Sequence, residues 1–340
     1  MLIWIRNKLF DRNILLRSVS FNFPIICVGN LAVGGTGKTP MVEFLIRLLK
    51  NKYSVATLSR GYKRKTTGFA IANENSTALD IGDEPMQFHK KFPKVTVAVA
   101  EERLVAIPQL LHDKPGTDVI ILDDAFQHRS VRAGLNILLT EYKNLFTRDF
   151  VLPAGDLRDV RSSMKRAEII IVTKCKSYLS DEEKNDLINE INPLPHQKIF
   201  FTKLEYGSPY HLFNKQERFL SPDTNILLIC GIANPKPLKE VLNVYVPTYE
   251  MMLFKDHHIF DIDDLEQIKK EFNRIESTNK MILTTEKDGV RLAKFQSELK
   301  DLPIYVFPIR HKILFSEEAQ FAGIVNRFIS DFKGVESSIA

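Results

Sequence analysis

Short apolar runs alternate with amphipathic stretches through the first two hundred residues of this chain. The apolar runs predict strands at Ile25–Val28, Ser54–Leu58, Val95–Ala100, Val119–Leu122, Asn136–Leu139, Ile169–Thr173 and Lys198–Thr202. The stretches between them predict helices at Met41–Lys50, Glu84–Phe92, Glu101–His112 and Asp181–Ile191. Strands rich in Val, Ile and Leu that alternate with helices are typical of a parallel sheet covered on both faces. The pattern therefore predicts an α/β fold with a mostly parallel sheet covered by helices.

The alternation breaks over residues 206–223, where Gly207, Pro209 and Pro222 predict a linker between domains. A second, smaller α/β domain is predicted over 224–333. Its expected strands and helices are Ile226–Cys230, a helix after Pro237, Tyr245–Tyr249, Asp261–Phe272, Met281–Thr284, Glu286–Phe295 and Ile304–Phe307. The other predicted units are an amphipathic membrane-proximal segment at 1–24, a core domain at 25–205 and a disordered tail at 334–340.

Composition narrows the class of protein. The three cysteines, Cys27, Cys175 and Cys230, all lie in or beside apolar runs, which indicates a reducing compartment and no disulfide framework. The net charge of +5 suits an anionic substrate or a membrane surface and gives no support for a nucleic-acid partner. Residues 1–21 mix apolar and basic side chains without approaching the ~20 apolar residues of a membrane span. Such a segment can lie at a membrane interface or pack as a helix on the protein itself.

The most specific motif follows the first predicted strand. A glycine-rich turn leads into Gly37-Lys38-Thr39 and then into a helix, which is the layout of a phosphate-binding loop (P-loop). The usual first glycine of that motif is replaced by Ala32. Backbone amides would hold the phosphates, Lys38 would reach the outer ones, and the Thr39 hydroxyl would ligate Mg²⁺. The predicted nucleotide-binding residues are Ala32, Val33, Gly34, Gly35, Thr36, Gly37, Lys38 and Thr39.

Paired carboxylates end another predicted strand, at Asp123 and Asp124. A second strand must deliver a carboxylate to the Mg²⁺ of a P-loop protein, so we predict that these two aspartates complete the metal site with Thr39. Gln127 and His128 follow at the same sheet edge and are candidates for orienting substrate or phosphate.

Four further loops carry polar groups. Arg60 opens a basic loop after a strand, and Arg158 follows a tight turn, so either guanidinium could hold an anionic substrate group. Asp83 sits in a turn that feeds a helix, where it could accept a proton, although the residues alone favour a helix cap. Asp256-His257-His258 could tune a base or hold a substrate hydroxyl.

Taken together, these loops resemble the tetraacyldisaccharide 4′-kinases, the lipid A 4′-kinases of Gram-negative bacteria. The resemblance rests on six motifs, which occur in the family's order. They are Gly29-Asn30-Leu31 with Gly34-Gly35-Thr36-Gly37-Lys38-Thr39-Pro40, Ser59-Arg60-Gly61-Tyr62, Gly82-Asp83-Glu84-Pro85, Asp123-Asp124-Ala125-Phe126-Gln127-His128, Asp256-His257-His258 and Thr284-Thr285-Glu286-Lys287-Asp288. Many family members have Gly where this chain has Ala125, and most begin with a longer apolar helix.

The resemblance implies a P-loop fold and a defined reaction. ATP, with Mg²⁺, would phosphorylate the 4′-hydroxyl of a tetraacyldisaccharide 1-phosphate to give lipid IV-A. It also implies that Asp83 is the base, assisted by His257 with His258 as the alternative, and that Lys38 acts in catalysis. The substrate would be an acylated disaccharide phospholipid, met at the cytoplasmic face of the inner membrane by a peripheral protein with no obligate protein partner.

Three other functions remain open on the residues alone. A partitioning ATPase needs a lysine near the start of the loop, where this chain has Val33. A GTP-dependent switch or metallochaperone needs a guanine-reading loop, and Thr173-Lys174-Cys175-Lys176 lacks its aspartate. A membrane-recruited nucleotide-binding module would bind ATP without transferring phosphate.

Overall fold

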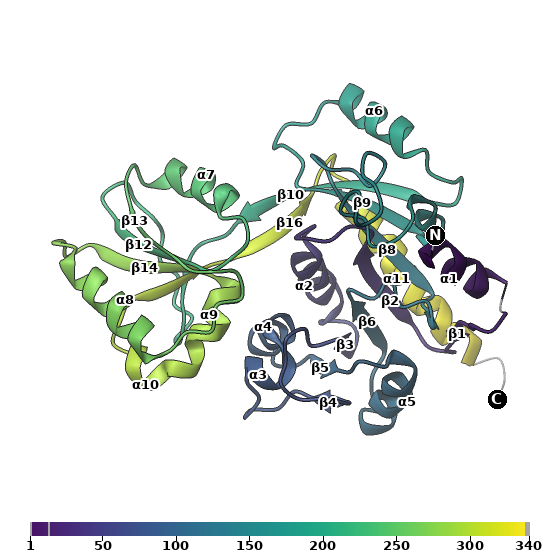
Figure 1. The fold of residues 1–340 in the computed structure, drawn as a ribbon, viewed down its shortest axis with the longest axis horizontal. Coiled ribbons are helices and arrows are strands. Elements are labelled where there is room, and N and C mark those ends of the chain that lie inside the picture. Colours follow the sequence, from purple (N-terminus) through teal and green to yellow (C-terminus); the bar gives the residue numbers. More distant parts are fainter. Residues whose placement is uncertain (1, 13, 337–340) are drawn as a thin grey trace.

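Two α/β units joined by a pair of strands make up the computed structural model, which describes residues 2–12 and 14–336 (Figure 1). Within these residues the larger sheet has nine strands. Their spatial order is β16 (Ile309–Ile313), β10 (Lys198–Tyr206), β9 (Ile169–Thr173), β8 (Leu135–Glu141), β2 (Ile25–Asn30), β6 (Val119–Asp123), β3 (Val55–Ser59), β5 (Thr96–Val99) and β4 (Ala70–Ile71). Neighbours are parallel except at the two edges, where β16 and β4 run antiparallel to their partners. The predicted α/β fold with a mostly parallel sheet is confirmed.

Helices cover both faces of this sheet. Side chains alternate along β2: Ile25 and Cys27 join one buried cluster, and Ile26 and Val28 join another. The first cluster packs under α5 (Arg103–Asp113) and α6 (Asp181–Ile191), and the second under α2 (Lys38–Leu49), α4 (Asp83–Lys91) and α11 (Glu318–Glu336). Because successive side chains of a strand point to opposite faces, a strand buried on both sides must be apolar throughout.

The smaller unit repeats this plan on a five-stranded sheet. Its spatial order is β11 (Tyr210–His211), β15 (Ile304–Phe307), β14 (Lys280–Thr285), β12 (Asn225–Cys230) and β13 (Glu250–Leu253). One buried cluster lies under α8 (Ile262–Arg274), α9 (Glu286–Leu292) and α10 (Gln296–Leu299), and a second under α7 (Lys236–Tyr245). Short elements complete the described chain: β1 (Val19–Ser20) paired with β7 (Val131–Arg132), α3 (Ala78–Ile81), η1 (Arg161–Arg166) and η2 (Ala293–Phe295).

The structure differs from the predicted partition in three places. The strand expected at Tyr245–Tyr249 is wrong, because α7 extends to Tyr245 and β13 begins at Glu250. The segment 206–223 is not an unstructured linker, since β11 within it pairs with β15. The end of the chain returns to the larger unit: β16 pairs with β10, and α11 packs on its core. Residues 334–336 belong to α11, and residues 337–340 of the expected tail lie outside the described residues.

The amino-terminal helix α1 (Leu2–Asp11) is anchored on one face and exposed on the other. Asn7 is buried and donates to Asp159 Oδ1 at 2.6 Å, and Asp11 pairs with Arg129. Trp4 and Ile5 remain exposed. Among the described residues, no helix combines the length and apolar character needed to cross a membrane.

Candidate active site

The P-loop occupies the carboxyl end of β2, where parallel sheets collect ligands. Gly37 is the N-cap of α2, adopts a φ of 88° and provides no side-chain cap, which leaves the first amides of the helix to an outside acceptor. Gly34 and Gly35 have open space where a side chain would stand. The Thr36 hydroxyl is buried and has no partner. This orphaned donor and the free amides fit an anion such as a nucleotide phosphate.

Lys38 extends from the start of α2 toward the polar end of β2. Its Nζ donates to Asn30 Oδ1 at 3.1 Å and lies 3.7 Å from Asp124 Oδ1. Burial lowers the pKa of Lys38, and the negative charge of Asp124 partly offsets that effect. A partly desolvated ammonium interacts strongly with a phosphate, because it has less hydration to lose.

Asn30, the last residue of β2, organises this cluster and was not predicted as a site residue. It is fully buried, and its Oδ1 accepts from Lys38 and from Arg158 Nη2, the latter at 2.6 Å. Its Nδ2 donates to the carbonyl of Ala32 at 2.7 Å. A buried polar residue at the end of an apolar strand was the signal available in the sequence.

The two predicted metal ligands differ in charge environment. Asp123 is buried with Ser59 Oγ at 3.3 Å, and burial, followed by the charge of Asp124, raises its pKa to about 7. Burial also opposes ionisation of Asp124, but Lys38 and Arg158 outweigh it and lower the Asp124 pKa. Asp123 is therefore a carboxylate short of positive charge, which suits a divalent cation.

Oxygen donors from Asp123, Asp124 and Thr39 match the preference of Mg²⁺ for hard ligands. Within the described part of the chain, no three His, Cys, Asp or Glu side chains are grouped to hold a metal. Mg²⁺ in nucleotide sites needs only one or two carboxylates, because water and phosphate oxygens complete its shell. The residues present fit the ion.

The predicted substrate-binding residues fall into two groups. Arg158 and Gln127 are committed to the cluster: Arg158 Nη2 donates to Asp124 Oδ1 at 2.7 Å, and Gln127 donates to the Asn30 carbonyl. Arg60 is exposed. The pKa of His128 falls to about 4, chiefly through burial and then through nearby arginines, Arg60 among them, so this imidazole is neutral near pH 7.

Asp83 opens α4 and makes a second cluster with the smaller unit. It is not the cap of that helix, since Gly82 holds the N-cap position. Its Oδ2 lies 3.1 Å from His257 Nδ1, and Lys287 Nζ lies 2.9 Å from His257 Nε2. The neighbouring His258 is occupied elsewhere, with Nε2 at 2.7 Å from Asp264 Oδ2. The geometry thus places His257, and not His258, beside Asp83.

Arg291 completes this second cluster and was missed in the sequence. It donates to Asp83 Oδ2 from Nη2 at 2.6 Å and from Nε at 3.1 Å, and to Asp288 from Nη1 at 3.1 Å. Burial of Asp83 favours its neutral form, but Arg291 outweighs this effect and lowers the pKa of Asp83. A signal was present, because Arg291 lies three residues after Asp288 on one helix face.

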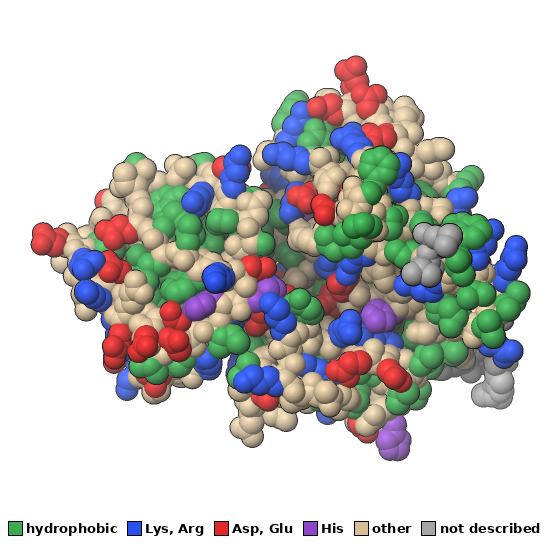
Figure 2. All heavy atoms as spheres, in the orientation of Figure 1, with side chains coloured by type: hydrophobic (Ala, Val, Ile, Leu, Met, Phe, Trp, Pro, Cys, Tyr) green, Lys and Arg blue, Asp and Glu red, His purple; other side chains and the backbone are tan. Residues whose placement is uncertain are grey.

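The Asp83 cluster lies where α4 of the larger unit packs against α9 of the smaller one. Figure 2 shows basic, acidic and histidine side chains gathered along this junction of the two units. Glu84, next to Asp83, is near enough to raise the pKa of Asp123 and to pair with Lys287 at 3.3 Å. The phosphate-binding cluster and the carboxylate–imidazole cluster therefore lie within electrostatic reach of each other.

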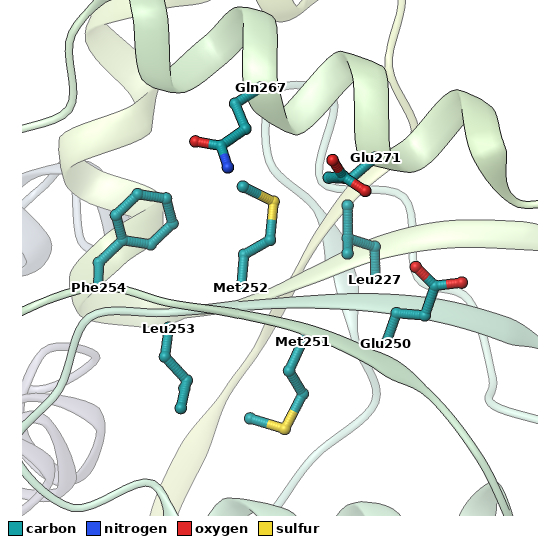
Figure 3. Close-up of a pocket in the computed structure, with 8 residues that line it drawn as sticks. All are labelled: Leu227, Glu250, Met251, Met252, Leu253, Phe254, Gln267 and Glu271. Carbon is teal, nitrogen blue, oxygen red and sulfur yellow. The ribbon is translucent and has the colours of Figure 1, made fainter.

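A separate pocket of about 310 Å³ lies in the smaller unit between the edge strand β13 and α8 (Figure 3). Its lining is Leu227, Glu250, Met251, Met252, Leu253, Phe254, Gln267 and Glu271. It offers two carboxylates and no cation, so it does not suit a nucleotide, and it shares no residue with either cluster.

Comparison with known proteins gives one consistent result. The family model described as LpxK, tetraacyldisaccharide-1-P 4′-kinase, matches residues 1–330. A tetraacyldisaccharide 4′-kinase of Flavobacterium johnsoniae is 49% identical over 313 residues, which cover 91% of this chain and 89% of the relative. One of Bacteroides thetaiotaomicron is 46% identical over 332 residues, covering 93% and 87%. The crystal structure of LpxK from Aquifex aeolicus in complex with ATP superposes with a TM-score of 0.74 at 28% identity, covering 96% of this chain and 95% of that one.

Proposed function

This chain belongs to the tetraacyldisaccharide-1-P 4′-kinase family, and from that premise we propose how its residues divide the work of phosphoryl transfer. The protein is an ATP-dependent kinase of lipid A biosynthesis that phosphorylates the 4′-hydroxyl of a tetraacylated disaccharide 1-phosphate. The phosphate-binding cluster of the larger unit positions ATP. The Asp83 cluster receives the sugar hydroxyl.

Asp83 is the base in this proposal, and the observation that carries it is its bonding to both His257 and Arg291 across the junction of the units. The 4′-oxygen attacks the γ-phosphorus, the bond from that phosphorus to the bridging oxygen of ADP breaks, and the hydroxyl proton passes to the carboxylate. Arg291 keeps Asp83 ionised by lowering its pKa. Lys287 Nζ, which can only donate, lies at His257 Nε2, while Nδ1 lies 3.1 Å from Asp83 Oδ2 and 3.2 Å from Arg291 Nη2. In the tautomer that carries its proton on Nδ1, His257 accepts from Lys287 and donates to Asp83.

The P-loop residues 32–39 hold the phosphates through their amides, and Lys38 stabilises the charge that develops on the transferred group. Thr39 and the Asp123–Asp124 pair would hold Mg²⁺, which would neutralise charge on the phosphate oxygens. Arg158 orients Asp124 and Asn30. The exposed Arg60, which is near enough to His128 to lower its pKa, contributes with Gln127 and His128 to holding the anionic substrate.

We assign the lipid-facing side to α1 and the residues that follow it. Trp4 is 54% exposed and Leu15 87% exposed, with Ile5 and Ile14 also exposed, and Lys8 Nζ lies 5.0 Å from the Trp4 ring. Apolar and cationic side chains on one surface suit the interface of an anionic bilayer. On this proposal the enzyme works peripherally at the cytoplasmic face of the inner membrane, without an obligate protein partner.

The membrane assignment has a direct test, because Trp4 is the single tryptophan of the chain. Vesicles of anionic phospholipid should shift its fluorescence emission to shorter wavelength, and zwitterionic vesicles should do so less. Leu15→Ser should weaken the shift, whereas Phe219→Ser, at an apolar position in the smaller unit that is 77% exposed, should not. An emission spectrum that no vesicle changes would remove α1 from the membrane surface.

The kinase reaction itself is tested with purified protein, Mg-ATP and the 1-phosphorylated lipid disaccharide. A bis-phosphorylated product at the 4′ position is expected, in amounts equal to the ADP released. Asp83→Ala and Asp123→Ala should each reduce turnover at least tenfold in folded protein. ATP hydrolysis without transfer to the lipid would favour the regulatory ATPase, and ATP binding without either reaction would favour the non-catalytic module.

A further inference from the structure

The strands that join the two units also touch the P-loop. β10 and β16 pair antiparallel at the edge of the larger sheet, from Thr202 opposite Ile313 to Tyr206 opposite Ile309. They continue directly into β11 and β15 of the smaller sheet, with the Gly207 amide donating to the Pro308 carbonyl at 3.0 Å. We call residues 198–211 and 304–313 the connecting ribbon; it runs between the units in Figure 1.

His311 lies on the ribbon with both ring nitrogens engaged. Its Nδ1 lies 2.9 Å from Thr202 Oγ1, and its Nε2 lies 2.9 Å from the carbonyl oxygen of Gly37. The side chain is buried, and burial lowers its pKa to about 4, so the ring is neutral near pH 7. A carbonyl can only accept, which puts the proton on Nε2 and leaves Nδ1 to accept from the Thr202 hydroxyl. The contacts define a single tautomer and ring orientation.

The backbone carbonyls of Thr36 and Gly37, the two residues before Lys38, both accept hydrogen bonds from side chains outside the loop. Thr173 Oγ1 donates to the carbonyl of Thr36 at 2.8 Å, and His311 donates to that of Gly37, which also accepts from the Met41 amide within α2. In a trans peptide the carbonyl of one residue and the N–H of the next point in opposite directions. Fixing these carbonyls therefore fixes the directions of the Gly37 and Lys38 amides, which point away from the Thr173 and His311 side chains.

The fit at Gly37 is close. A Cβ on Gly37 would stand 2.9 Å from His311 Nε2, so the ring fills the space that a larger residue would need. The strand β16 packs along α2, which places the ring at the start of that helix. Thr202, Gly37 and His311 are thus matched in shape and in hydrogen bonding.

We propose that His311 is a positioning residue for nucleotide binding, which aims the Lys38 amide at the phosphates by holding the Gly37 carbonyl, while Thr173 holds the Thr36 carbonyl and with it the Gly37 amide. The proposal rests on the P-loop role of residues 32–39 given above. It also ties the P-loop to the strand that carries the smaller unit, and with it His257. A histidine that only filled the core would stabilise the fold without selecting an amide direction.

Two substitutions separate these roles, because the amide nitrogen of glutamine occupies about the place of Nε2 and that of asparagine about the place of Nδ1. His311→Gln keeps a donor for Gly37, and His311→Asn does not. We expect His311→Asn to raise the Kd for Mg-ATP and the KM for ATP about tenfold, with the KM for lipid unchanged. His311→Gln should stay within about twofold of the natural protein. Thr202→Val, which removes only the other partner, should lower Tm without changing the Kd.

Calorimetric titration with Mg-ATP in the absence of lipid decides the question. The proposal is overturned if His311→Asn binds Mg-ATP as the natural protein does, or if the glutamine variant is weakened as much as the asparagine variant. If His311→Asn does not fold, His311→Gln alone decides: tenfold weaker binding by that folded variant refutes the role. Failure of the underlying P-loop assignment looks different, since Lys38→Ala would then bind Mg-ATP with the natural Kd.

Discussion

Replacing Asp83 by asparagine removes the proposed base while keeping the shape of the side chain. The amide cannot accept the hydroxyl proton, so turnover must fall if that proton leaves through Asp83. Asp83 bonds none of the P-loop residues, so we expect the KM for ATP to stay within about twofold. The substitution therefore separates proton acceptance from nucleotide binding.

The size of two effects of Asp83→Asn can be worked out: the loss of turnover and the loss of stability. General-base catalysis contributes about 10²- to 10⁴-fold, equivalent to about 3–5 kcal/mol of activation free energy. The accompanying loss of stability is smaller, because Arg291 keeps a carboxylate partner in Asp288 at 3.1 Å and is not left unpaired. Losing charged hydrogen bonds of the kind seen at Asp83 costs about 1.5–3 kcal/mol. We therefore expect kcat to fall at least a hundredfold in a protein that still unfolds cooperatively.

The assay is steady-state transfer of phosphate to the lipid, with thermal unfolding measured on the same samples. Asp80→Asn is the matched control, since Asp80 lies three residues away and serves only the capping box of α3 with Thr77. Its turnover should remain near that of the natural protein. A kcat for Asp83→Asn within threefold of that of the Asp80 control would refute Asp83 as the base.

Three further outcomes follow from the same contacts. Arg291→Gln removes the group that holds the pKa of Asp83 low, so burial should raise that pKa and move the acid limb of the kcat profile to higher pH; an unmoved limb argues against the pairing. Lys38→Ala should weaken Mg-ATP binding and reduce turnover at least tenfold, as measured by titration and lipid phosphorylation. His257→Gln should lower kcat while His258→Gln leaves it unchanged, because only His257 contacts Asp83; equal losses would contradict this.

The larger sheet could be predicted because its strands are buried on both faces. In a strand such as Ile169–Thr173 the first four residues are all apolar, and that pattern can be recognised without knowledge of the neighbouring strands. β16 could not be recognised in this way. Its sequence, Ile309 to Ile313, is short and has three consecutive polar residues at its centre. Its place is set by pairing with β10, about a hundred residues earlier in the chain. Only the tertiary structure shows that pairing.

Near the end of the chain, the spacing of apolar residues indicates a helix. Phe321, Val325 and Ile329 recur every four residues and are fully buried against the larger sheet. That spacing predicts one apolar helix face, but it does not say which sheet the face covers. The predicted smaller domain, 224–333, includes most of α11 only because of its position in the sequence. In the structure α11 packs on the larger unit, which carries the P-loop.

The candidate site residues also divide into those that local sequence predicts and those that only tertiary contacts bring together. Residues at the end of a strand or in the loop after it, such as Asp123 and Lys38, can be predicted from local pattern, because strand ends meet at one sheet edge. The partners of Asp83 were not, since Arg291 and His257 approach it from another unit. From the residues alone Asp83 was favoured as a helix cap. In the structure the Asp83 carboxylate contacts His257 and Arg291 of the smaller unit, and Gly82 is the N-cap residue of α4.

A carboxylate paired with arginine is a weak base, and the chemistry explains why a weak base is enough. Phosphoryl transfer passes through a loose transition state in most analyses, in which the attacking oxygen has formed little of its new bond. The hydroxyl becomes strongly acidic only as that bond completes, so Asp83 needs to be ionised and correctly placed more than it needs to be strongly basic. Arg291 keeps Asp83 ionised, and the contact with His257 fixes the position of the carboxylate. Both residues come from the smaller unit, so the proposed base has both its partners only when that unit lies against α4.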